Sequence, residues 1–237
     1  MKLNGIEFNK IYCMDCIELM QQLPDECIDL VIADPPYFAD KSFVTGIDKY
    51  NRLDLRTKES YLDWSCVWLE EACRLLNDKG SLYLFAGNII WSLYSILEKK
   101  LIYRNAISWI KKNRLVSVPQ LKNWFPKTEI ILFFTKSDKY IWNPIVKKYG
   151  IMESSNFQII PNIMRNMKEG VDHPSQKPLK LICKFIEASS KENSLVLDPF
   201  LGSGTTAVAA RKLNRNFLGC DSDPNSVKIA EERLSRL

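Results

Sequence analysis

Short apolar runs rich in β-branched and aromatic residues alternate along the chain with longer stretches of helical spacing. The apolar runs predict buried strands, and apolar residues that recur every three or four positions predict helices that cover them. We expect strands over residues 10–14, 27–32, 81–86, 103–110, 129–135, 195–197 and 217–219. We expect helices over residues 15–22, 59–76, 89–99, 178–188, 205–213 and 224–234. This alternation predicts an α/β fold, with a doubly wound, mostly parallel sheet and helices on both faces.

Three segments lack both periods. Residues 38–57 are polar and predict a lid-like loop, because loops of this length without structure of their own are usually functional. Residues 111–127 are irregular and basic, and residues 140–171 are a candidate recognition segment. At 237 residues the chain fits a single domain, residues 1–237, with a full core.

The net charge of +5 is distributed unevenly. Residues 99–148 carry twelve lysines and arginines but only two acids, Glu129 and Asp138, so this segment alone has a net charge of +10. Trp109 and Trp124 are among the aromatic residues that separate these charges. Basic surfaces with interleaved aromatic rings are typical of proteins that bind a polyanion, and we favour nucleic acid. A charged face that only contacts solvent is the alternative.

Several protein classes are disfavoured. The first ten residues lack the apolar segment of a signal peptide, and no apolar run is long enough to span a bilayer. The seven cysteines are scattered; Cys13 and Cys16 are two residues apart but have no second pair to complete a zinc site. With a single histidine, we expect no metal site. We expect reduced thiols and a cytoplasmic location, with no membrane partner.

The predicted strand 27–32 leads into the tetrapeptide Asp34-Pro35-Pro36-Tyr37. Pro35 keeps Asp34 out of the helical region, and each proline removes a backbone donor. A carboxylate, free carbonyl oxygens and a tyrosine ring therefore gather at one strand tip. This set is suited to accept hydrogen bonds from an amino group on a flat ring that stacks on Tyr37. An ordinary proline turn is the alternative.

A second landmark, residues 197–207, runs from a predicted strand through a glycine loop to a helix start. Gly202 and Gly204, with Asp221 after the next strand, also match the dinucleotide fingerprint, so a nicotinamide enzyme is an alternative. Asp198 argues against it, because a carboxylate at the strand tip repels a pyrophosphate but suits a cation. A phosphate-loop nucleotidase fits less well, because no Lys-Ser/Thr follows the second glycine.

S-adenosylmethionine fits these residues better than a ligand with phosphates. Its ammonium and sulfonium groups suit Asp198 and Asp34, and its carboxylate can meet backbone donors at a helix start. Its ribose diol can bond Asp221. Ligands of open α/β sheets bind outside the carboxyl ends of the strands, where both landmarks are predicted to lie. The sequence therefore predicts S-adenosylmethionine as the cofactor.

The chain resembles the DNA amino-methyltransferases that use S-adenosylmethionine, and more narrowly their circularly permuted β group, in which the catalytic tetrapeptide precedes the cofactor loop. The matching segments are Asp34-Pro35-Pro36-Tyr37, residues 198–206 and His173-Pro174-Ser175-Gln176-Lys177-Pro178, with a further match over residues 14–25. The resemblance implies a Rossmann-like methyltransferase fold in permuted order. It does not cover residues 38–57 and 140–171, where we expect target recognition.

The resemblance implies roles for the matching residues. The tetrapeptide Asp34-Pro35-Pro36-Tyr37 is the implied catalytic segment, in which Asp34 and the Pro35 carbonyl accept hydrogen bonds from the target amine. Asp15 lies at the position that contacts the cofactor's adenine, and His173 beside its methionine moiety. The implied cofactor residues are Asp15, Cys16, Asp34, His173, Lys177, Asp198, Phe200, Gly202, Ser203, Gly204, Thr205, Thr206 and Asp221.

Ordinary structural roles stay open for several of these residues. Asp15 occupies a helix N-cap position, and Asp221 could simply initiate the last helix. Outside its motif, His173 would be read as a buried core histidine. Lys177 could only cap the helix that starts at Pro178.

In this family, Asp rather than Ser before Pro-Pro-Tyr favours N6 of adenine over N4 of cytosine, so we expect adenine-specific methylation of DNA. Cytosine N4, an RNA substrate and a non-catalytic nucleic-acid-binding module are the alternatives. Asn113, Arg114, Lys122 and Trp124 are candidate DNA contacts, with an exposed loop as their alternative. A homodimer and a restriction endonuclease partner are further expectations from the family.

Overall fold

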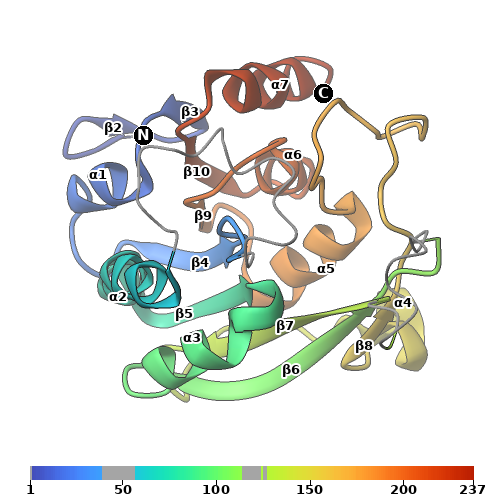
Figure 1. The fold of residues 1–237 in the computed structure, drawn as a ribbon, viewed down its shortest axis with the longest axis horizontal. Helices are drawn as coiled ribbons and strands as arrows, with labels where there is room; N and C mark the ends of the chain where they lie inside the picture. The colour runs from blue at the N-terminus through green and yellow to red at the C-terminus, as the bar shows by residue number, and fades with distance from the viewer. Residues whose placement is uncertain (1, 39–56, 114–123, 125–126) are drawn as a thin grey trace.

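The structure, a computed structural model, describes residues 2–38, 57–113, 124 and 127–237 (Figure 1). The strands are β1 (Lys2–Leu3), β2 (Ile6–Glu7), β3 (Lys10–Cys13), β4 (Ile28–Ala33), β5 (Leu76–Phe85), β6 (Ile102–Ile110), β7 (Thr128–Thr135), β8 (Phe157–Ile159), β9 (Leu195–Asp198) and β10 (Asn216–Asp221). The helices are α1 (Cys16–Gln21), α2 (Lys58–Leu75), α3 (Ile90–Leu97), α4 (Val146–Glu153), α5 (Leu179–Ser189), α6 (Thr205–Lys212) and α7 (Pro224–Leu234), with a 3₁₀ turn η3 (Gly87–Ile89) before α3. The predicted lid-like loop, apart from its ends, lies outside the described residues.

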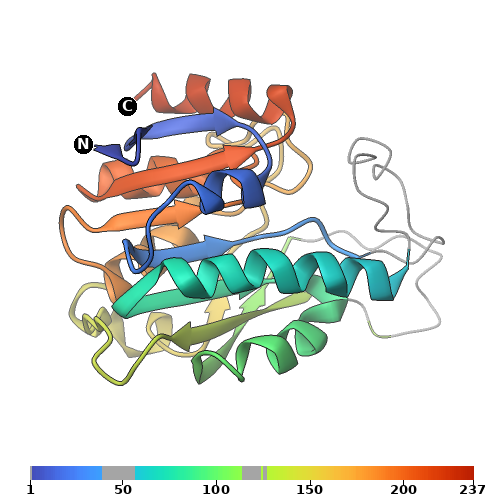
Figure 2. The same ribbon diagram turned by 90° about the vertical axis from the view of Figure 1, so that its left-hand side faces the viewer.

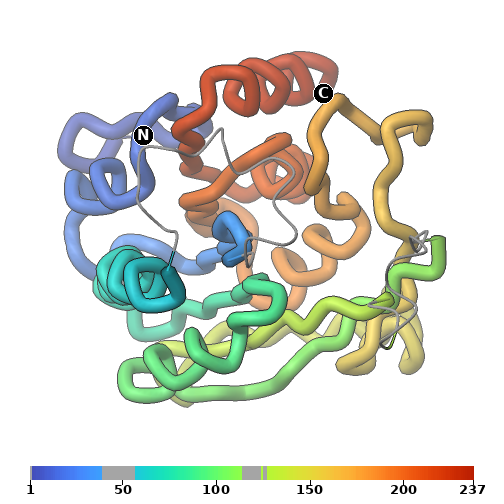
Figure 3. Tube along the Cα trace, viewed as in Figure 1, coloured from blue at the N-terminus to red at the C-terminus, as the bar shows by residue number. Residues whose placement is uncertain are grey.

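The main sheet has eight strands in the order β3-β10-β9-β4-β5-β7-β6-β8, and β1 and β2 form a separate pair. Neighbouring strands from β3 to β5 are parallel, β7 is antiparallel to both β5 and β6, and β8 is parallel to β6. Strands from the two ends of the chain lie side by side, because β3 pairs with β10 (Figure 3). The predicted doubly wound, mostly parallel α/β sheet is confirmed.

Helices cover both faces of the sheet (Figures 1 and 2). α1, α2 and α3 lie on one face, where Met20, Trp68 and Leu93 are fully buried. α5, α6 and α7 lie on the other, where Phe185 and Ala230 are buried. Each helix presents its apolar stripe to the sheet, so each face of the sheet has its own core. None of the helices in the described ranges is long and apolar enough to cross a membrane.

The helix ends follow local capping chemistry. α7 has the predicted bounds, because the Asp223 carboxylate caps it and Pro224 occupies its first turn. The side chains of Thr57 and Ser60 form a capping box at the start of α2. Asp15 caps α1 and accepts hydrogen bonds from the N–H groups of Ile17 and Glu18. The N-cap reading of Asp15 is therefore confirmed.

Two elements differ from the prediction. β5 begins at Leu76 rather than at residue 81. Leu76 already pairs with Ile28 of β4, and the register between the two strands shifts before Ser81 pairs with Leu30. The Asn77 amide donates to Asp29 on β4 and helps to hold this irregularity. Residues 140–171 contain α4, broken at Gly150, and β8, which pairs with β6. A three-residue strand is too short to show a period, which is why the sequence did not predict it.

We expect Tyr83→Ala to lower the free energy of unfolding by about 3–5 kcal/mol, because it removes a large buried ring. Tyr83 on β5 stacks between Phe133 and Phe185, at centroid distances of 4.7 and 4.3 Å. Its hydroxyl lies 2.8 Å from the Ser189 hydroxyl, so Tyr83→Phe should cost only about 1 kcal/mol. Denaturant unfolding of both variants measures the difference, and equal losses would contradict a packing role for the ring.

Candidate active site

Three aspartates gather at one edge of the sheet. β4, β9 and β10 are adjacent parallel strands, and Asp34 follows β4 while Asp198 and Asp221 are the last residues of β9 and β10. Burial raises the pKa of all three carboxyl groups, that of Asp198 to about 7. The carboxyl edge predicted from the two landmarks is therefore formed, and it is suited to a cationic ligand.

One carboxylate oxygen of Asp34 accepts a hydrogen bond, and the other has no partner in the described structure. Its Oδ2 accepts a hydrogen bond from the Lys177 ammonium at 2.5 Å. Its Oδ1 is buried and has no hydrogen-bond partner in the described structure. Burial raises the pKa of this carboxyl, and the Lys177 charge opposes that rise. Of the residues in the implied catalytic segment and the His-Pro segment, Asp34 and Lys177 are thus brought into direct contact.

The rest of the tetrapeptide is held by specific contacts. The Tyr61 hydroxyl on α2 donates to the Pro36 carbonyl at 2.9 Å. The Tyr37 ring packs against Gly87, where a Cβ would lie only 2.8 Å from the ring and where φ is +54°. A side chain at position 87 would therefore displace the Tyr37 ring. The Tyr37 hydroxyl donates a hydrogen bond to Glu129.

Glu129 is a site residue that the sequence analysis missed. It is 7% exposed and accepts hydrogen bonds from Tyr37 and from the Lys111 ammonium. The Lys177 nitrogen, which binds Asp34, also lies 3.5 Å from Glu129 Oε1. The nearby lysines lower the pKa of this buried carboxyl. A signal was present in the sequence, because Glu129 is the single acid among residues 111–137.

Strand direction explains why Glu129 and Lys111 reach this edge. β7 runs antiparallel to β5 and β6, so its first residues lie where those two strands end. Ile110, the last residue of β6, pairs with Thr128, the first of β7. Lys111 and Glu129 are the next residues along the chain, so both lie beside the tip of β4.

The glycine loop between β9 and α6 is shaped by close approaches. Gly202 and Gly204 have positive φ values of 50° and 77°, which favour glycine. A Cβ at Gly202 would lie 3.1 Å from the His173 ring, so the predicted His-Pro segment does pack on this loop. The Phe200 ring lies edge-on to Trp68 of α2, with centroids 5.0 Å apart. The backbone N–H of Phe200 donates a hydrogen bond to Asp198 Oδ1 at 3.0 Å.

The loop hydroxyls contact the protein itself. The buried Arg233 of α7 donates to the Ser203 carbonyl at 2.6 Å and to the Thr205 hydroxyl at 3.0 Å. The Thr205 hydroxyl also donates to the Lys177 carbonyl at 3.2 Å. The Thr206 hydroxyl lowers the pKa of Asp198, against the larger effect of burial. These residues therefore fix the loop and Lys177 in place.

The edge at β10 and β3 completes the site. Asp221 accepts the N–H groups of Gly202 and Asp223, both at 2.9 Å. Cys13, at the end of β3, pairs with Asp221, which brings the cap residue Asp15 to the same edge. Cys16 is buried, and burial raises the pKa of its thiol, so it stays protonated at neutral pH.

Of the four candidate DNA contacts, the structure describes Asn113 and Trp124. Arg114 and Lys122 lie outside the described residues. The Asn113 side chain donates to the Asn162 carbonyl at 2.8 Å and accepts its N–H at 2.7 Å, so it joins two loops. Trp124 is 94% exposed.

The described cations of the basic segment lie at both edges of the sheet. Arg104 and Lys139 pair with Asp138 and Asp78 at the amino edge of β5, opposite the edge that holds Lys111. The cations of residues 99–148 with a carboxylate partner in the described structure are Lys100, Arg104, Lys111, Lys139 and Lys148. Ion pairs within the protein thus involve five of the twelve cations that suggested a polyanion surface.

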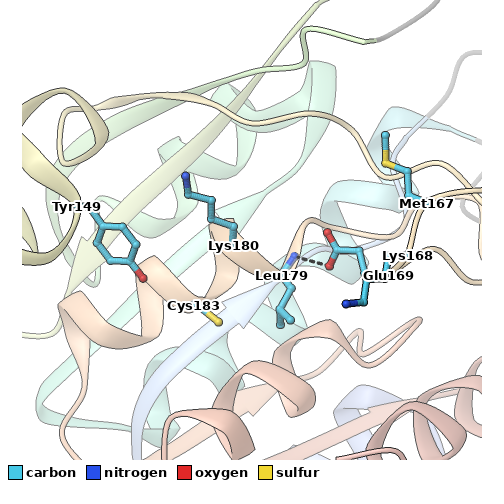
Figure 4. Close-up of a pocket in the computed structure, with 7 residues that line it drawn as sticks. All are labelled: Tyr149, Met167, Lys168, Glu169, Leu179, Lys180 and Cys183. Atoms are coloured by element: carbon cyan, nitrogen blue, oxygen red, sulfur yellow. Dashed lines mark hydrogen bonds between the residues drawn. The ribbon is translucent and has the colours of Figure 1, made fainter.

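A pocket of about 700 Å³ lies beside α5 (Figure 4). Its lining residues are Tyr149, Met167, Lys168, Glu169, Leu179, Lys180 and Cys183. The Glu169 carboxylate accepts the Leu179 N–H at 3.2 Å and so caps the start of α5. None of the three strand-end aspartates lines this pocket. The described residues contain no cluster of three metal-ligating side chains.

The edge fits S-adenosylmethionine by the chemistry of its donors. The buried Asp198 and the half-buried Asp34 and Asp221, at three adjacent strand ends, suit the ligand's cations, and Gly202 and Gly204 leave room beside the loop. The unpartnered Asp34 Oδ1 lies within this set. The fold and the site together define a methyltransferase of the Rossmann-like class.

Comparison with known proteins gives the family. The chain matches the DNA methylase family of N6 and N4 amino-methyltransferases over residues 28–232, and it belongs to that family. It is 34% identical to the type II methyltransferase M.HpaI of Haemophilus parainfluenzae, over 95% of this chain and 74% of that relative. The protein is therefore a DNA amino-methyltransferase related to the enzymes of restriction–modification systems, and the β-group resemblance is confirmed.

Solved structures agree. The complex of M1.HpyAVI with S-adenosylmethionine is 29% identical, with a TM-score of 0.69 over 95% of this chain and 98% of that one. The cytosine-N4-specific PvuII DNA methyltransferase, at 20% identity, has a TM-score of 0.79 over 94% of this chain and 85% of that one, and shows the fold alone. The Rossmann-like methyltransferase fold is confirmed, and S-adenosylmethionine is the cofactor.

The raised pKa of Asp198 predicts that the stability of the folded protein depends on pH. Its pKa of about 7 in the folded protein lies above the ~3.9 of an unfolded aspartate, so only the folded state holds this proton between these values. The free energy of unfolding of the cofactor-free protein should therefore fall as pH rises from about 4 to 7. We expect Asp198→Asn to flatten this dependence in urea titrations. Parallel profiles for both proteins would contradict the assignment.

Proposed function

We propose that the protein transfers a methyl group from S-adenosylmethionine to the N6 amine of adenine in DNA. The observation that carries this proposal is the buried Asp34 Oδ1, which has no hydrogen-bond partner in the described structure. A buried acceptor without a partner is costly, so its presence at a ligand-binding edge indicates that a ligand donates to it. An exocyclic amine is such a donor, and the aromatic ring of Tyr37 lies in the same tetrapeptide.

The proposed chemistry follows from the weakness of that amine as a nucleophile. Its lone pair is delocalised into the base, and acceptance of its hydrogens by Asp34 and the Pro35 carbonyl favours a tetrahedral nitrogen. Bound S-adenosylmethionine supplies the methyl group: a C–N bond forms as a C–S bond breaks, and the methylated nitrogen releases one proton to water. The protein supplies position and electrostatic stabilisation, so no side chain needs to act as a nucleophile.

Tyr37 is proposed to stack on the target base after its extrusion from the duplex, a contact worth about 1–3 kcal/mol. The structure supports this role by the way the ring is held. Its hydroxyl is anchored on Glu129, and Gly87 leaves room for one ring face. A ring fixed at both ends of its side chain loses little conformational entropy when a base stacks on it.

The proposed cofactor contacts divide by charge. Asp198 and Asp34 would face the ammonium and sulfonium groups, Asp221 the ribose and Asp15 the adenine. His173 packs against Gly202, which supports a place beside the methionine moiety. The remaining proposed contacts are Cys16, Phe200, Gly202, Ser203, Gly204, Thr205 and Thr206.

Lys177 is better described as the partner of Asp34 than as a direct cofactor contact. It is almost fully buried and binds Asp34 Oδ2, and its nitrogen lies 5.3 Å from the Tyr37 ring centroid. The charge of Lys177 favours the ionised form of Asp34. We therefore assign Lys177 to the amine-binding side of the site.

Cytosine N4 is the second candidate target. It presents the same amine geometry as adenine N6, so Asp34 and Pro35 would serve both, and the PvuII methyltransferase is a cytosine-N4 enzyme of the same fold. The choice of adenine rests on Asp in place of Ser before Pro-Pro-Tyr. An RNA substrate and a non-catalytic nucleic-acid-binding module are weaker, because the family acts on DNA and the acceptor oxygen of Asp34 is intact.

We further propose residues 140–171 as the segment that recognises the target sequence, together with the loop 38–57. Of the two candidate DNA contacts within the described residues, Trp124 is the more exposed. A homodimer and an accompanying restriction endonuclease are proposed from the family. A cytoplasmic location is proposed because all seven cysteines are free thiols.

Labelled methyl transfer tests this function. Protein, S-adenosylmethionine with a labelled methyl group and unmethylated genomic DNA should yield N6-methyladenine on nucleoside analysis. We expect Asp34→Ala to reduce the rate at least about 100-fold, because it removes the acceptor for the amine. A folded Asp34→Ala protein with the wild-type rate would overturn the mechanism. Label in N4-methylcytosine or in RNA would overturn the target.

The matched control is Asp138→Ala. Asp138 is an exposed aspartate that pairs with Arg104 at the opposite edge of the sheet. Loss of this carboxylate should leave the rate unchanged, so a similar loss in both variants would indicate a general effect of charge or stability.

A further inference from the structure

Four ionised side chains form one buried group at the tip of β4. Asp34 binds Lys177, Lys177 lies 3.5 Å from Glu129, and Glu129 binds Lys111. The side chains of Lys111, Lys177 and Glu129 are no more than 11% exposed. Within the described part of the chain, the two carboxylates and two ammonium groups of this group sum to no net charge. Tyr37 adds a hydroxyl that donates to Glu129.

Glu129 occupies the centre of the group. It receives three cationic or polar donors from three different parts of the chain: Tyr37 after β4, Lys111 after β6 and Lys177 before α5. Asp34, by contrast, binds the Lys177 ammonium through Oδ2, and its Oδ1 has no hydrogen-bond partner in the described structure. Without Glu129, Tyr37 and the two lysines would compete for the oxygens of Asp34, since a buried donor must find an acceptor.

We propose that Glu129 is a positioning residue for methyl transfer: it takes the Tyr37 hydroxyl and shares the Lys177 ammonium, which leaves one Asp34 oxygen for the target amine and keeps the group electrically neutral. This inference rests on the proposed function of Asp34. The neutrality matters because S-adenosylmethionine is a sulfonium cation, and an uncompensated lysine charge beside its site repels it.

The first test is the pH dependence of methyl transfer by Glu129→Gln. The glutamine keeps the size of the side chain and one acceptor oxygen but removes the charge. Glu129 raises the pKa of Asp34, so its loss should move the acid limb of the kcat/KM profile to lower pH. We expect kcat to fall about 10- to 100-fold, because Tyr37 and Lys177 are no longer held.

The titratable groups that interact with Asp34 in this test come from five parts of the chain. They are Tyr37 after β4, Tyr61 on α2, Glu129 on β7, Lys177 before α5 and Asp198 on β9, with Lys111 behind Glu129. Loss of the negative charge of Glu129 lowers the pKa of Asp34, and this defines the direction of the shift. A merely structural role would lower the melting temperature and leave the acid limb where it is.

The second test needs no methyl transfer. Calorimetry compares S-adenosylmethionine with S-adenosylhomocysteine, which lacks the sulfonium charge. In Glu129→Gln the ratio of their Kd values should shift about threefold to tenfold against the cation. Adding Lys111→Gln restores neutrality, so the double variant should recover the wild-type ratio. An unchanged ratio in Glu129→Gln, or no recovery in the double variant, would overturn the role of charge.

Glu71→Gln is the control for loss of a glutamate that pairs with a cation. Glu71 binds Arg74 within α2 at 2.6 Å, and its side chain is 19% exposed. This variant should keep the wild-type Kd ratio and acid limb. Suppose that Asp34→Ala is inactive but Glu129→Gln matches the wild type in rate, acid limb and Kd ratio. The inference about Glu129 is then wrong, and the proposed function stands. If Asp34→Ala stays active, the proposed function fails.

Discussion

The ion pair between Lys177 and Asp34 joins two halves of the chain at the carboxyl edge of the sheet. Taking both charges out of water is costly, so the pair is stable only where further contacts hold it. The Thr205 hydroxyl holds the backbone of Lys177, and Glu129 lies near its ammonium. Arg233 in turn fixes Thr205 from α7. The positions of the glycine loop, the His-Pro segment and the tetrapeptide thus depend on one another.

The reversal of strand direction at β7 gives this edge its chemistry. The parallel strands β4, β9 and β10 bring only aspartates to the edge, which would leave an excess of negative charge. Because β7 starts where β6 ends, it adds Glu129 together with Lys111. An antiparallel strand beside a parallel set therefore places both ends of a connection at the ligand-binding edge, which a crossover helix does not do.

Local signals in the sequence predicted most of the fold. α7 was predicted to the residue because a cap and a proline mark its start, and the landmarks at Asp34 and Asp198 were both at the predicted edge. Glu129 was missed because its role depends on which strands are neighbours, and no spacing along the chain reveals that. The three residues of β8 are too few to show a period, and the early start of β5 depends on its pairing with β4, which no local pattern reveals.

The order of the strands has a consequence for how the protein comes into being. Asp34 is separated from Lys177 by 143 residues, and β4 binds the start of β9 through Asp29 across 166 residues. Contacts of such long range form slowly, since a large loop must close before they are gained. A chain still emerging from the ribosome therefore carries the tetrapeptide without its lysine and without β9. The carboxyl edge of the sheet can therefore be completed only after synthesis has passed β9 and the glycine loop.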